Sequence, residues 1–188
     1  MKNKLIFLAL ASSLLLVTRA GIAGTEGETY AGIQYAYGDY NEDGISKTFK
    51  PTLLIGRVGQ FFTPNFSIEG RLGFGMQDDT QYLPEFGSGY DATLKLDNLF
   101  GLYGTGHFNL TESSSIYGVL GVSQVSGTAS VPSFPGLESS EDNSSVSYGI
   151  GADIGLGSKA SLNIEYIRYL DKPDFTLDAI SVGAGYRF

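Results

Sequence analysis

The chain has 188 residues, a formal net charge of −8, no cysteine, and 12 tyrosines, 12 phenylalanines and 26 glycines. The lack of cysteine excludes disulfides and lipidation of a mature N-terminal cysteine, and the acidic balance argues against nucleic acid as a partner. Many aromatic residues beside many glycines favour β-structure over helix.

The N-terminal residues have the pattern of a secretory signal. Lys2 and Lys4 precede an apolar stretch from Leu5 to Val17, which is shorter than the roughly 20 residues that a membrane helix needs. Small residues before and at Ala23 match a cleavage site. We therefore expect residues 1–23 to be a cleaved signal peptide and residues 24–188 to form one domain. Cleavage removes three cationic residues and would change the formal charge from −8 to −11.

The remaining chain predicts membrane-spanning strands. No later stretch is apolar enough for a spanning helix, so a span would require a closed sheet, whose signature is repeated segments of about 10 residues that alternate in polarity. Eight segments fit: Tyr30 to Gly38, Thr52 to Phe62, Phe66 to Met76, Ala92 to Asn109, Ile116 to Thr128, Val146 to Leu156, Leu162 to Leu170, and Ile180 to Phe188. The predicted fold is all-β, an eight-stranded antiparallel up-and-down transmembrane β-barrel.

The alternation also assigns the two faces of each strand. The clearest case places large apolar side chains on one face and small or charged ones on the other: Phe66, Ile68, Leu72, Phe74 and Met76 against Ser67, Glu69, Arg71, Gly73 and Gly75. In the second segment Leu54, Val58 and Phe62 are expected to face lipid, and in the fifth Ile116, Leu120 and Val122. A soluble sheet would need a second sheet to cover so many large apolar side chains, whereas a membrane barrel does not.

The connections between the segments alternate in length. The short ones are at Phe61 to Asn65, Asn109 to Ser115 and Gly157 to Lys159, and the long polar ones are at Asp39 to Lys47, Gln77 to Asp91 and Gly127 to Asn143. Asp171 to Asp174 is an unusually short fourth connection on the long-loop side. In barrels of this kind the short turns face the periplasm and the long loops face outside.

The last segment, Val182-Gly183-Ala184-Gly185-Tyr186-Arg187-Phe188, resembles the terminal strand of the OmpX/Ail group and of the wider porin family of small outer-membrane barrels. Ser115 to Val122 and Ser147 to Ala152 are similar to the same group. The resemblance implies a monomer in the outer membrane of a Gram-negative bacterium, in contact with lipid and lipopolysaccharide. It also implies that the barrel-assembly machinery recognises Tyr186 and Phe188. It specifies a fold and not an activity. The acidic loops depart from the basic, aromatic surface expected of a host-binding Ail-like protein.

Eight charged residues are expected to point into the lumen: Arg57, Glu69, Arg71, Lys95, Asp97, Asp153, Glu165 and Arg187. Four carry each sign, so we expect them to pair in a network that fills an eight-stranded interior. The alternative is a narrow conduit, in which the inward glycines leave room for water or a small ion. Because porin-sized flow needs about 16 strands, we expect little or no conductance.

The sequence offers little for catalysis, a cofactor or a metal. The one histidine, His107, is expected near the periplasm, and the position two residues later is Asn109 rather than a serine. A hydrolytic site needs a nucleophile beside its base, so a structural role is favoured. The acidic pairs Asp78-Asp79 and Glu141-Asp142 lack the spacing of a metal loop and are interpreted as solvated loop charges.

The function predicted from sequence is that of an integral outer-membrane barrel with a self-filled lumen, without enzymatic activity. It would contribute to envelope integrity or to surface contact through its external loops. A narrow porin-like channel and an adhesin or receptor remain as alternatives. The candidate loop contacts are the aromatic residues Tyr40, Tyr82, Phe86, Tyr90 and Phe134. Aromatic residues near the rim are equally typical of an interfacial girdle.

Overall fold

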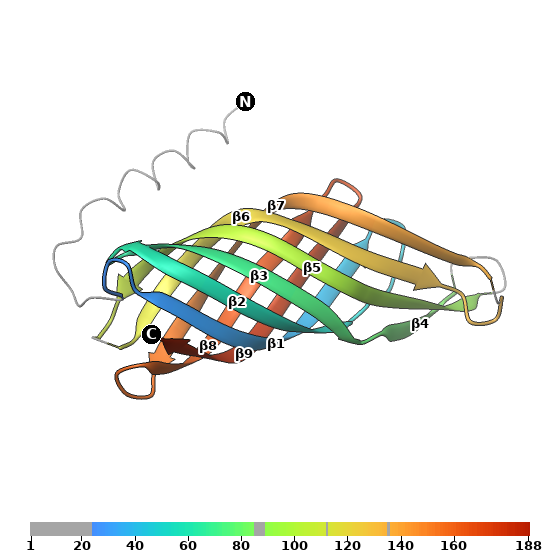
Figure 1. The fold of residues 1–188 in the computed structure, drawn as a ribbon. Coiled ribbons are helices and arrows are strands. Elements are labelled where there is room, and N and C mark those ends of the chain that lie inside the picture. The colour runs from blue at the N-terminus through green and yellow to red at the C-terminus, as the bar shows by residue number, and fades with distance from the viewer. Residues whose placement is uncertain (1–23, 85–88, 112, 135) are drawn as a thin grey trace, which may run out of the picture.

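The computed structural model describes residues 24–84, 89–111, 113–134 and 136–188, which form a closed barrel (Figure 1). The predicted signal peptide (residues 1–23) and Phe86 lie outside the described residues. The strands are β1 (Thr29–Glu42), β2 (Thr52–Thr63), β3 (Phe66–Gln77), β4 (Asp79–Leu83), β5 (Tyr90–Asn109), β6 (Ser115–Ser130), β7 (Glu138–Gly155), β8 (Ala160–Asp171) and β9 (Phe175–Arg187). All pairings between them are antiparallel.

The sheet closes on itself because β1 pairs with β9 and β3 pairs with β5. The short strand β4 pairs with β5 just beyond the end of β3. β3 and β4 therefore occupy one strand position of the barrel, which has eight positions in all. The predicted eight-stranded antiparallel barrel is therefore confirmed. The prediction of a loop over Gln77 to Asp91 is wrong at Asp79 to Leu83, which form strand β4. The sequence did not indicate this strand because Thr80 and Tyr82 do not continue the alternation of apolar and polar residues.

The outer wall carries the large apolar side chains that the alternation predicts. Leu72, Leu120 and Ile150 are 52%, 62% and 69% exposed, although each lies in a hydrogen-bonded strand. No second sheet covers this belt within the described chain. No helix among the described residues is long and apolar enough to cross a membrane.

The two ends of the barrel differ. At the terminus end, where β1 starts and β9 ends, neighbouring strands are joined by tight turns, and Gly157 adopts φ 120° in the turn from β7 to β8, a conformation that favours glycine. At the opposite end β5, β6 and β7 extend past the other strands and, with β4, form a projecting sheet (Figure 1). We call this the projecting end.

The projecting sheet corrects a second loop prediction, that of Gly127 to Asn143. β6 continues to Ser130 and β7 starts at Glu138, and the two strands pair as far as Ser130 and Glu138. The segment lacks apolar alternation because both of its faces lie outside the apolar belt. Hydroxyl groups add cross-strand hydrogen bonds to the projecting sheet, at 2.7 Å between Thr80 of β4 and Thr93 of β5 and at 2.9 Å between Thr128 of β6 and Ser140 of β7.

Candidate functional site

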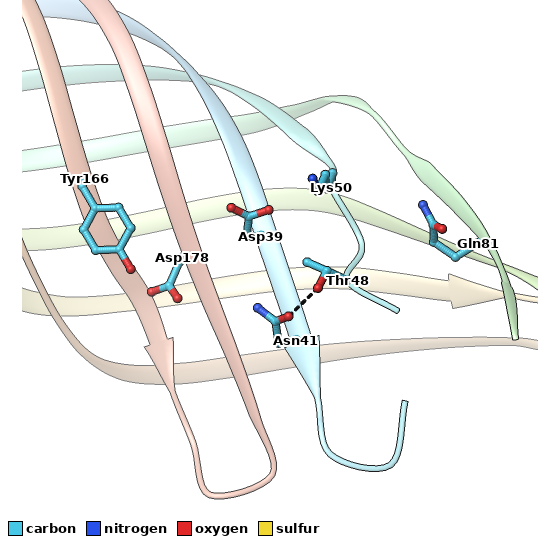
Figure 2. Close-up of a pocket in the computed structure, with 7 residues that line it drawn as sticks. All are labelled: Asp39, Asn41, Thr48, Lys50, Gln81, Tyr166 and Asp178. Carbon is cyan, nitrogen blue, oxygen red and sulfur yellow. Dashed lines mark hydrogen bonds between the residues drawn. The ribbon is translucent and has the colours of Figure 1, made fainter. Parts of the chain in front are cut away.

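A shallow groove of about 590 Å³ lies on the outer wall near the projecting end (Figure 2). Polar side chains line most of it: Asp39, Asn41, Thr48, Lys50, Gln81, Tyr166 and Asp178. Asp39 and Asn41 have the same parity on β1 as Ile33 and Tyr37, which are more than half exposed on the outer wall. The groove therefore lies outside the barrel, directly above the apolar belt.

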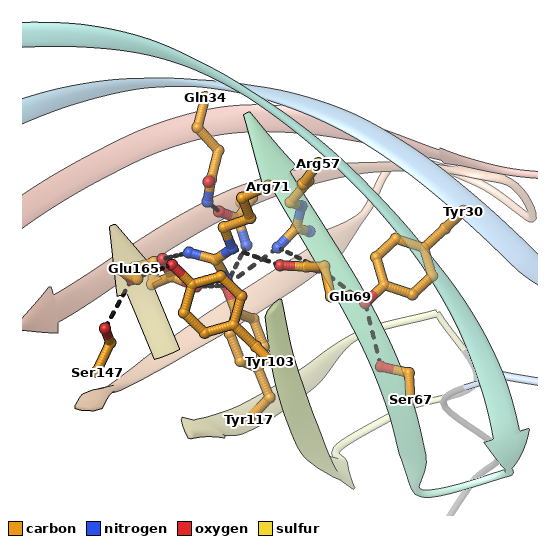
Figure 3. Close-up of polar contacts among 12 residues, drawn as sticks. Tyr30, Gln34, Arg57, Ser67, Glu69, Arg71, Tyr103, Tyr117, Ser147 and Glu165 are labelled. Atoms are coloured by element: carbon orange, nitrogen blue, oxygen red, sulfur yellow. Dashed lines mark hydrogen bonds and ion pairs between the residues drawn. The ribbon is translucent and has the colours of Figure 1, made fainter. Parts of the chain in front are cut away.

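The lumen on the terminus side is filled by a cluster of charged groups (Figure 3). Arg71 of β3 is its centre. Its guanidinium makes a two-pronged contact with Glu165 of β8, with N–O distances of 2.5 and 2.8 Å, and donates through Nε to Glu69 at 2.6 Å. The same guanidinium lies 4.6 Å from the ring centre of Tyr103, within reach of a cation–π contact.

Arg57 of β2 makes the second half of the cluster. It is the direct cross-strand partner of Arg71, and carboxylates separate the two like charges. Arg57 donates to Asp153 at 3.0 Å and lies 3.6 Å from Glu69. Asn163 donates to the same Asp153 oxygen at 2.9 Å, so this carboxylate is held from β2 and β8 together.

Neutral side chains add further hydrogen bonds to the cluster. The Tyr117 hydroxyl donates to Glu165 at 2.9 Å and accepts from Asn163 at 2.7 Å. The Tyr30 hydroxyl donates to the second oxygen of Glu69 at 2.8 Å. Asn163 also accepts a hydrogen bond from Gln34 of β1. The cluster thus joins β1, β2, β3, β6, β7 and β8 across the lumen.

The five charges of this cluster are almost fully buried, with exposed fractions between 1% and 5%. Buried ions are unfavourable unless they are paired and their remaining hydrogen-bonding positions are filled. The two guanidiniums and three carboxylates are paired with one another through charge-assisted hydrogen bonds, and among the described residues only Nε of Arg57 and the side-chain oxygen of Gln34 stay without a hydrogen-bond partner in this cluster. These side chains fill the lumen at this level with paired charges.

The lumen on the projecting side is filled differently, by an apolar plug. The plug is a single cluster of buried residues: Ala36, Leu53, Ile55, Leu96, Leu99, Tyr103, Val119, Val125, Ile167, Tyr169, Leu170, Leu177 and Ala179. Leu53, Leu99 and Ile167 are completely buried. Tyr103 and Tyr169 form the boundary, since the Tyr169 hydroxyl lies 3.4 Å from Arg71. The interior is therefore closed by two successive layers of different chemistry.

The inward glycines make room for these side chains and do not widen a conduit. A Cβ at Gly151 would overlap the Tyr117 ring, and one at Gly121 would overlap the backbone of Tyr103. At Gly149 a Cβ would come within 2.9 Å of the Ile167 side chain. At these glycines the space beside the backbone is occupied by side-chain and backbone atoms of the neighbouring strands.

His107 is placed near the terminus end, as expected. Its Nε2 lies 3.2 Å from the hydroxyl of Ser67, a contact that the sequence did not predict because the two residues are on different strands. Its ring packs against Phe61 and Tyr117 with centroid distances of 4.9 and 5.5 Å. Ser67 is completely buried, so the hydroxyl has no access for a substrate.

Three members of the predicted lumen network lie elsewhere. Lys95 and Asp97 pair with each other at 2.9 Å near the projecting sheet, and the Lys95 side chain is 60% exposed. The prediction that Lys95 faces the lumen is wrong because a bulge between Leu96 and Asn98 shifts the register and places Leu96 inside. The same bulge leaves Asp97 beside the outer hydroxyl of Thr128, at 2.8 Å. Arg187 lies at the terminus end, with its guanidinium 5.9 Å from the ring centre of Phe61.

The candidate loop contacts do not form one surface. Tyr40 packs on Phe175 at the edge of the apolar plug, with a ring-centre distance of 5.6 Å, so it belongs to the interior. Tyr90 is half-buried in the β4–β5 ladder. Tyr82 and Phe134 are 52% and 60% exposed on the projecting sheet and its tip.

The residues of the predicted assembly signal lie together on the outer wall. Tyr186 and Phe188 are exposed at the terminus end, with ring centres 5.3 Å apart. Their outward orientation agrees with the parity expected from the sequence.

Sequence reasoning missed the neutral members of the cluster. Tyr30, Tyr117 and Asn163 were predicted only as parts of strands, although their inward parity is a signal that could have placed them in the lumen. Asp79 was interpreted as a solvated loop charge, yet it accepts the backbone N–H of Lys50 and the amide of Gln81, both at 2.8 Å. Among the described residues, no group of three or more His, Cys, Asp or Glu side chains could hold a metal ion.

Comparison with known proteins agrees with the β-barrel fold. The family described as outer membrane protein beta-barrel domain matches residues 7–188. Ail, the attachment invasion locus protein of Yersinia pestis, is 22% identical with a TM-score of 0.62, over 87% of this chain and 100% of that one. OprG from Pseudomonas aeruginosa is 16% identical with a TM-score of 0.62, over 90% and 99%. Neisserial surface protein A is 16% identical with a TM-score of 0.58, over 87% and 100%.

At these identities the three structures share the fold alone with this chain. A comparison with curated protein sequences finds no match.

Proposed function

The chain belongs to the outer membrane protein β-barrel domain family, and from this premise we propose that it is a sealed barrel that holds a projecting sheet at the cell surface. It lies in the outer membrane. By the rule that short turns face the periplasm, the terminus end is periplasmic and the projecting end is external. The cationic start, the short apolar stretch and the small residues before the cleavage site support the proposal that residues 1–23 are removed as a signal peptide.

The filled lumen is the observation that carries the sealed-barrel proposal. A solute entering from outside would first have to displace Leu53, Leu99 and Ile167, all completely buried, and then separate Arg71 from Glu165. It is energetically unfavourable to displace packed aliphatic side chains, and it is also unfavourable to separate a buried ion pair. A passive channel is therefore the weaker candidate.

Conductance measurements test this proposal directly. The full-length barrel, refolded into planar bilayers, should give no stable single-channel current, and liposomes that contain it should swell in sugar solutions no faster than empty liposomes. A porin of about 16 strands in the same preparation serves as the positive control. A stable, large and reproducible current from the barrel would overturn the proposal.

Surface contact is the role that the projecting sheet favours. Three exposed apolar side chains lie on the projecting sheet and its tip, outside the apolar belt of the barrel: Tyr82 on β4, and Phe134 and Leu137 between β6 and β7, 52% to 60% exposed. Exposed apolar groups beyond a membrane belt are typical of contact surfaces. A chain in which a two-residue Asn-Gly turn replaces residues 127–141, between the paired Ser126 and Asp142, keeps the barrel and removes the tip.

This truncation should abolish binding of intact cells to host cells or matrix, whereas shortening the β1–β2 connection at residues 43–47 should not. Equal binding by both variants would contradict a role for the projecting sheet and leave envelope integrity as the supported function. That role predicts detergent sensitivity on deletion of the protein, with no dependence on the tip.

We propose a structural role for His107 and for Tyr186 and Phe188 a role in barrel assembly. The buried contact of His107 with Ser67 lacks an approach for lipid, which supports the non-enzymatic interpretation. Loss of a lipid A modification after His107→Ala, seen by mass spectrometry, would contradict this interpretation.

Replacing Phe188 with alanine should slow assembly in vivo while leaving refolding in detergent intact. This result would separate recognition by the assembly machinery from stability of the barrel.

A further inference from the structure

We propose that the outer-wall groove at the projecting end binds the saccharide part of an outer-leaflet glycolipid. The inference depends on the outer-membrane location and not on the sealed lumen or the surface-contact role. Tyr37, 58% exposed, precedes Asp39 on the outward face of β1, and Tyr166, 46% exposed, forms one rim of the groove. Tyrosines of this kind mark the membrane–water interface. The groove therefore lies at the level of lipid headgroups.

The lining offers both donors and acceptors, held by local hydrogen bonds. The Thr48 hydroxyl donates to the Asn41 side-chain oxygen at 2.6 Å, which leaves the amide N–H groups of Asn41 to donate to a ligand. Gln81 donates its amide to Asp79, which leaves its oxygen to accept. Asp79 also accepts a hydrogen bond from the Lys50 backbone, so one carboxylate holds two residues of the lining.

The charges of the groove disfavour a metal cation and a phosphate group, the two other ligands expected at the level of lipid headgroups. A cation would need several free carboxylates, but Asp178 is already held by Arg168 at 2.7 and 2.9 Å, and the Lys50 ammonium repels cations. A phosphate would meet the Asp39 carboxylate, which has the same charge as the phosphate, whereas the charge of its cross-strand partner Asp178 is already offset by Arg168. Among the described residues, none makes a hydrogen bond or an ion pair with the Asp39 carboxylate.

A neutral polyhydroxylated ring fits the groove better. Its hydroxyl groups can donate to Asp39 and Gln81 and accept from Asn41 and Lys50, so each unused group of the lining gains a partner. A donor placed between Asp39 and Asp178 would also offset the repulsion of these two carboxylates. The volume of about 590 Å³ lies in the range of small-molecule sites.

Retention of rough lipopolysaccharide by the purified barrel tests the proposal. The full-length protein is refolded into phosphatidylcholine nanodiscs that contain rough lipopolysaccharide, and the sugar that stays with the protein after detergent exchange is quantified by mass spectrometry. The double variant Asp39→Ala with Asn41→Ala should retain about five- to ten-fold less, the loss expected when several hydrogen bonds disappear.

The matched control is Gln124→Ala with Ser144→Ala, two polar residues that pair across β6 and β7 on the outer wall and lie outside the groove. It should retain as much as the wild type. Folding of every variant is checked by the shift in gel mobility on heating. If the double variant does not fold, Thr48→Val removes one hydroxyl with little change in shape. Unchanged retention in the groove variants, or equal loss in the control, would overturn the proposal.

Two further arms identify the part of the glycolipid that is recognised. Chemically dephosphorylated lipopolysaccharide should be retained equally, and its loss would show a phosphate site and contradict the proposal. The free oligosaccharide released from the same lipopolysaccharide should compete only in large excess, because it lacks the membrane anchor that concentrates the ligand. Competition at equal concentration would assign the groove to soluble glycans and overturn the lipid assignment.

Discussion

The two layers of the lumen fill the same barrel by different means. On the terminus side, Arg57 and Arg71 meet three carboxylates and a shell of hydroxyl and amide groups. On the projecting side, Leu53, Leu99 and other aliphatic side chains pack against one another, and polar contacts are made by the tyrosines at the boundary. The polar layer depends on each partner, since removing one leaves another charge buried and unpaired. The apolar layer depends on volume and shape, which neighbours can partly compensate.

The largest effect is expected from Arg71→Ala. The change leaves Glu69 and Glu165 buried without their main partner, and the free energy of unfolding should fall by about 3 to 5 kcal/mol. A urea titration of the barrel refolded into phospholipid vesicles, followed by the gel mobility of unheated samples, measures it. Arg168→Ala, at an ion pair that is partly exposed, is the control and should change stability by less than about 1 kcal/mol. Similar losses at both positions would remove the distinction between the network and ordinary surface pairs.

Leu99→Ala should have the next largest effect. The side chain is completely buried in the apolar plug, so its truncation creates a cavity and should lower the free energy of unfolding by about 2 to 5 kcal/mol. The same change at lipid-facing Leu102, 59% exposed, is the control and should have a smaller effect, because no cavity forms there. If the two variants lost equal stability, the plug would not be packed as described. The urea titration above also serves here.

Conservative substitutions sharpen the contrast between the two layers. Arg71→Lys keeps the charge but removes the planar fork that contacts Glu165 through two N–O pairs, so a loss of about 1.5 to 3 kcal/mol is expected. Leu99→Met keeps volume and polarity and should lose less than about 1.5 kcal/mol. Equal tolerance at both positions in urea titrations would mean that shape alone, and not pairing geometry, fills the polar layer.

The sequence predicted this architecture unevenly, for physical reasons. Period-two alternation places Arg57, Glu69 and Arg71 inside because the apolar belt of the neighbouring positions must face lipid. It cannot choose partners across the lumen, since the contact of Arg71 with Glu165 joins strands 94 residues apart in the chain. The apolar plug was also missed. Leu53 and Leu99 lie next to large outward side chains, so both faces are apolar there and the contrast that reveals the lumen elsewhere is lost.

Local irregularities account for the remaining differences. The bulge at Asp97 exchanges the two faces of β5 and takes Lys95 out of the lumen, and no turn residue announces it. The polar strands of the projecting sheet lack the alternation that reveals the other strands. For the groove, the relevant residues come from four strands and one connection, so only the closed barrel brings them together.

The smallest effect is expected outside both layers, at Asp97. The hydrogen bond from Lys95 is the main cause that holds the pKa of the Asp97 carboxyl below its ordinary value, although burial acts in the opposite direction. A carboxyl with a lowered pKa stabilises the folded state above its ordinary pKa, and this contribution disappears as the pH falls through the folded-state pKa. Asp97→Asn should therefore be slightly less stable than the wild type at pH 7, and the difference should close below about pH 4. High salt should reduce it as well, because both side chains reach solvent. An undiminished difference in the urea midpoint at acidic pH would show that Asp97 acts through the geometry of the bulge, by way of Thr128, and not through its charge.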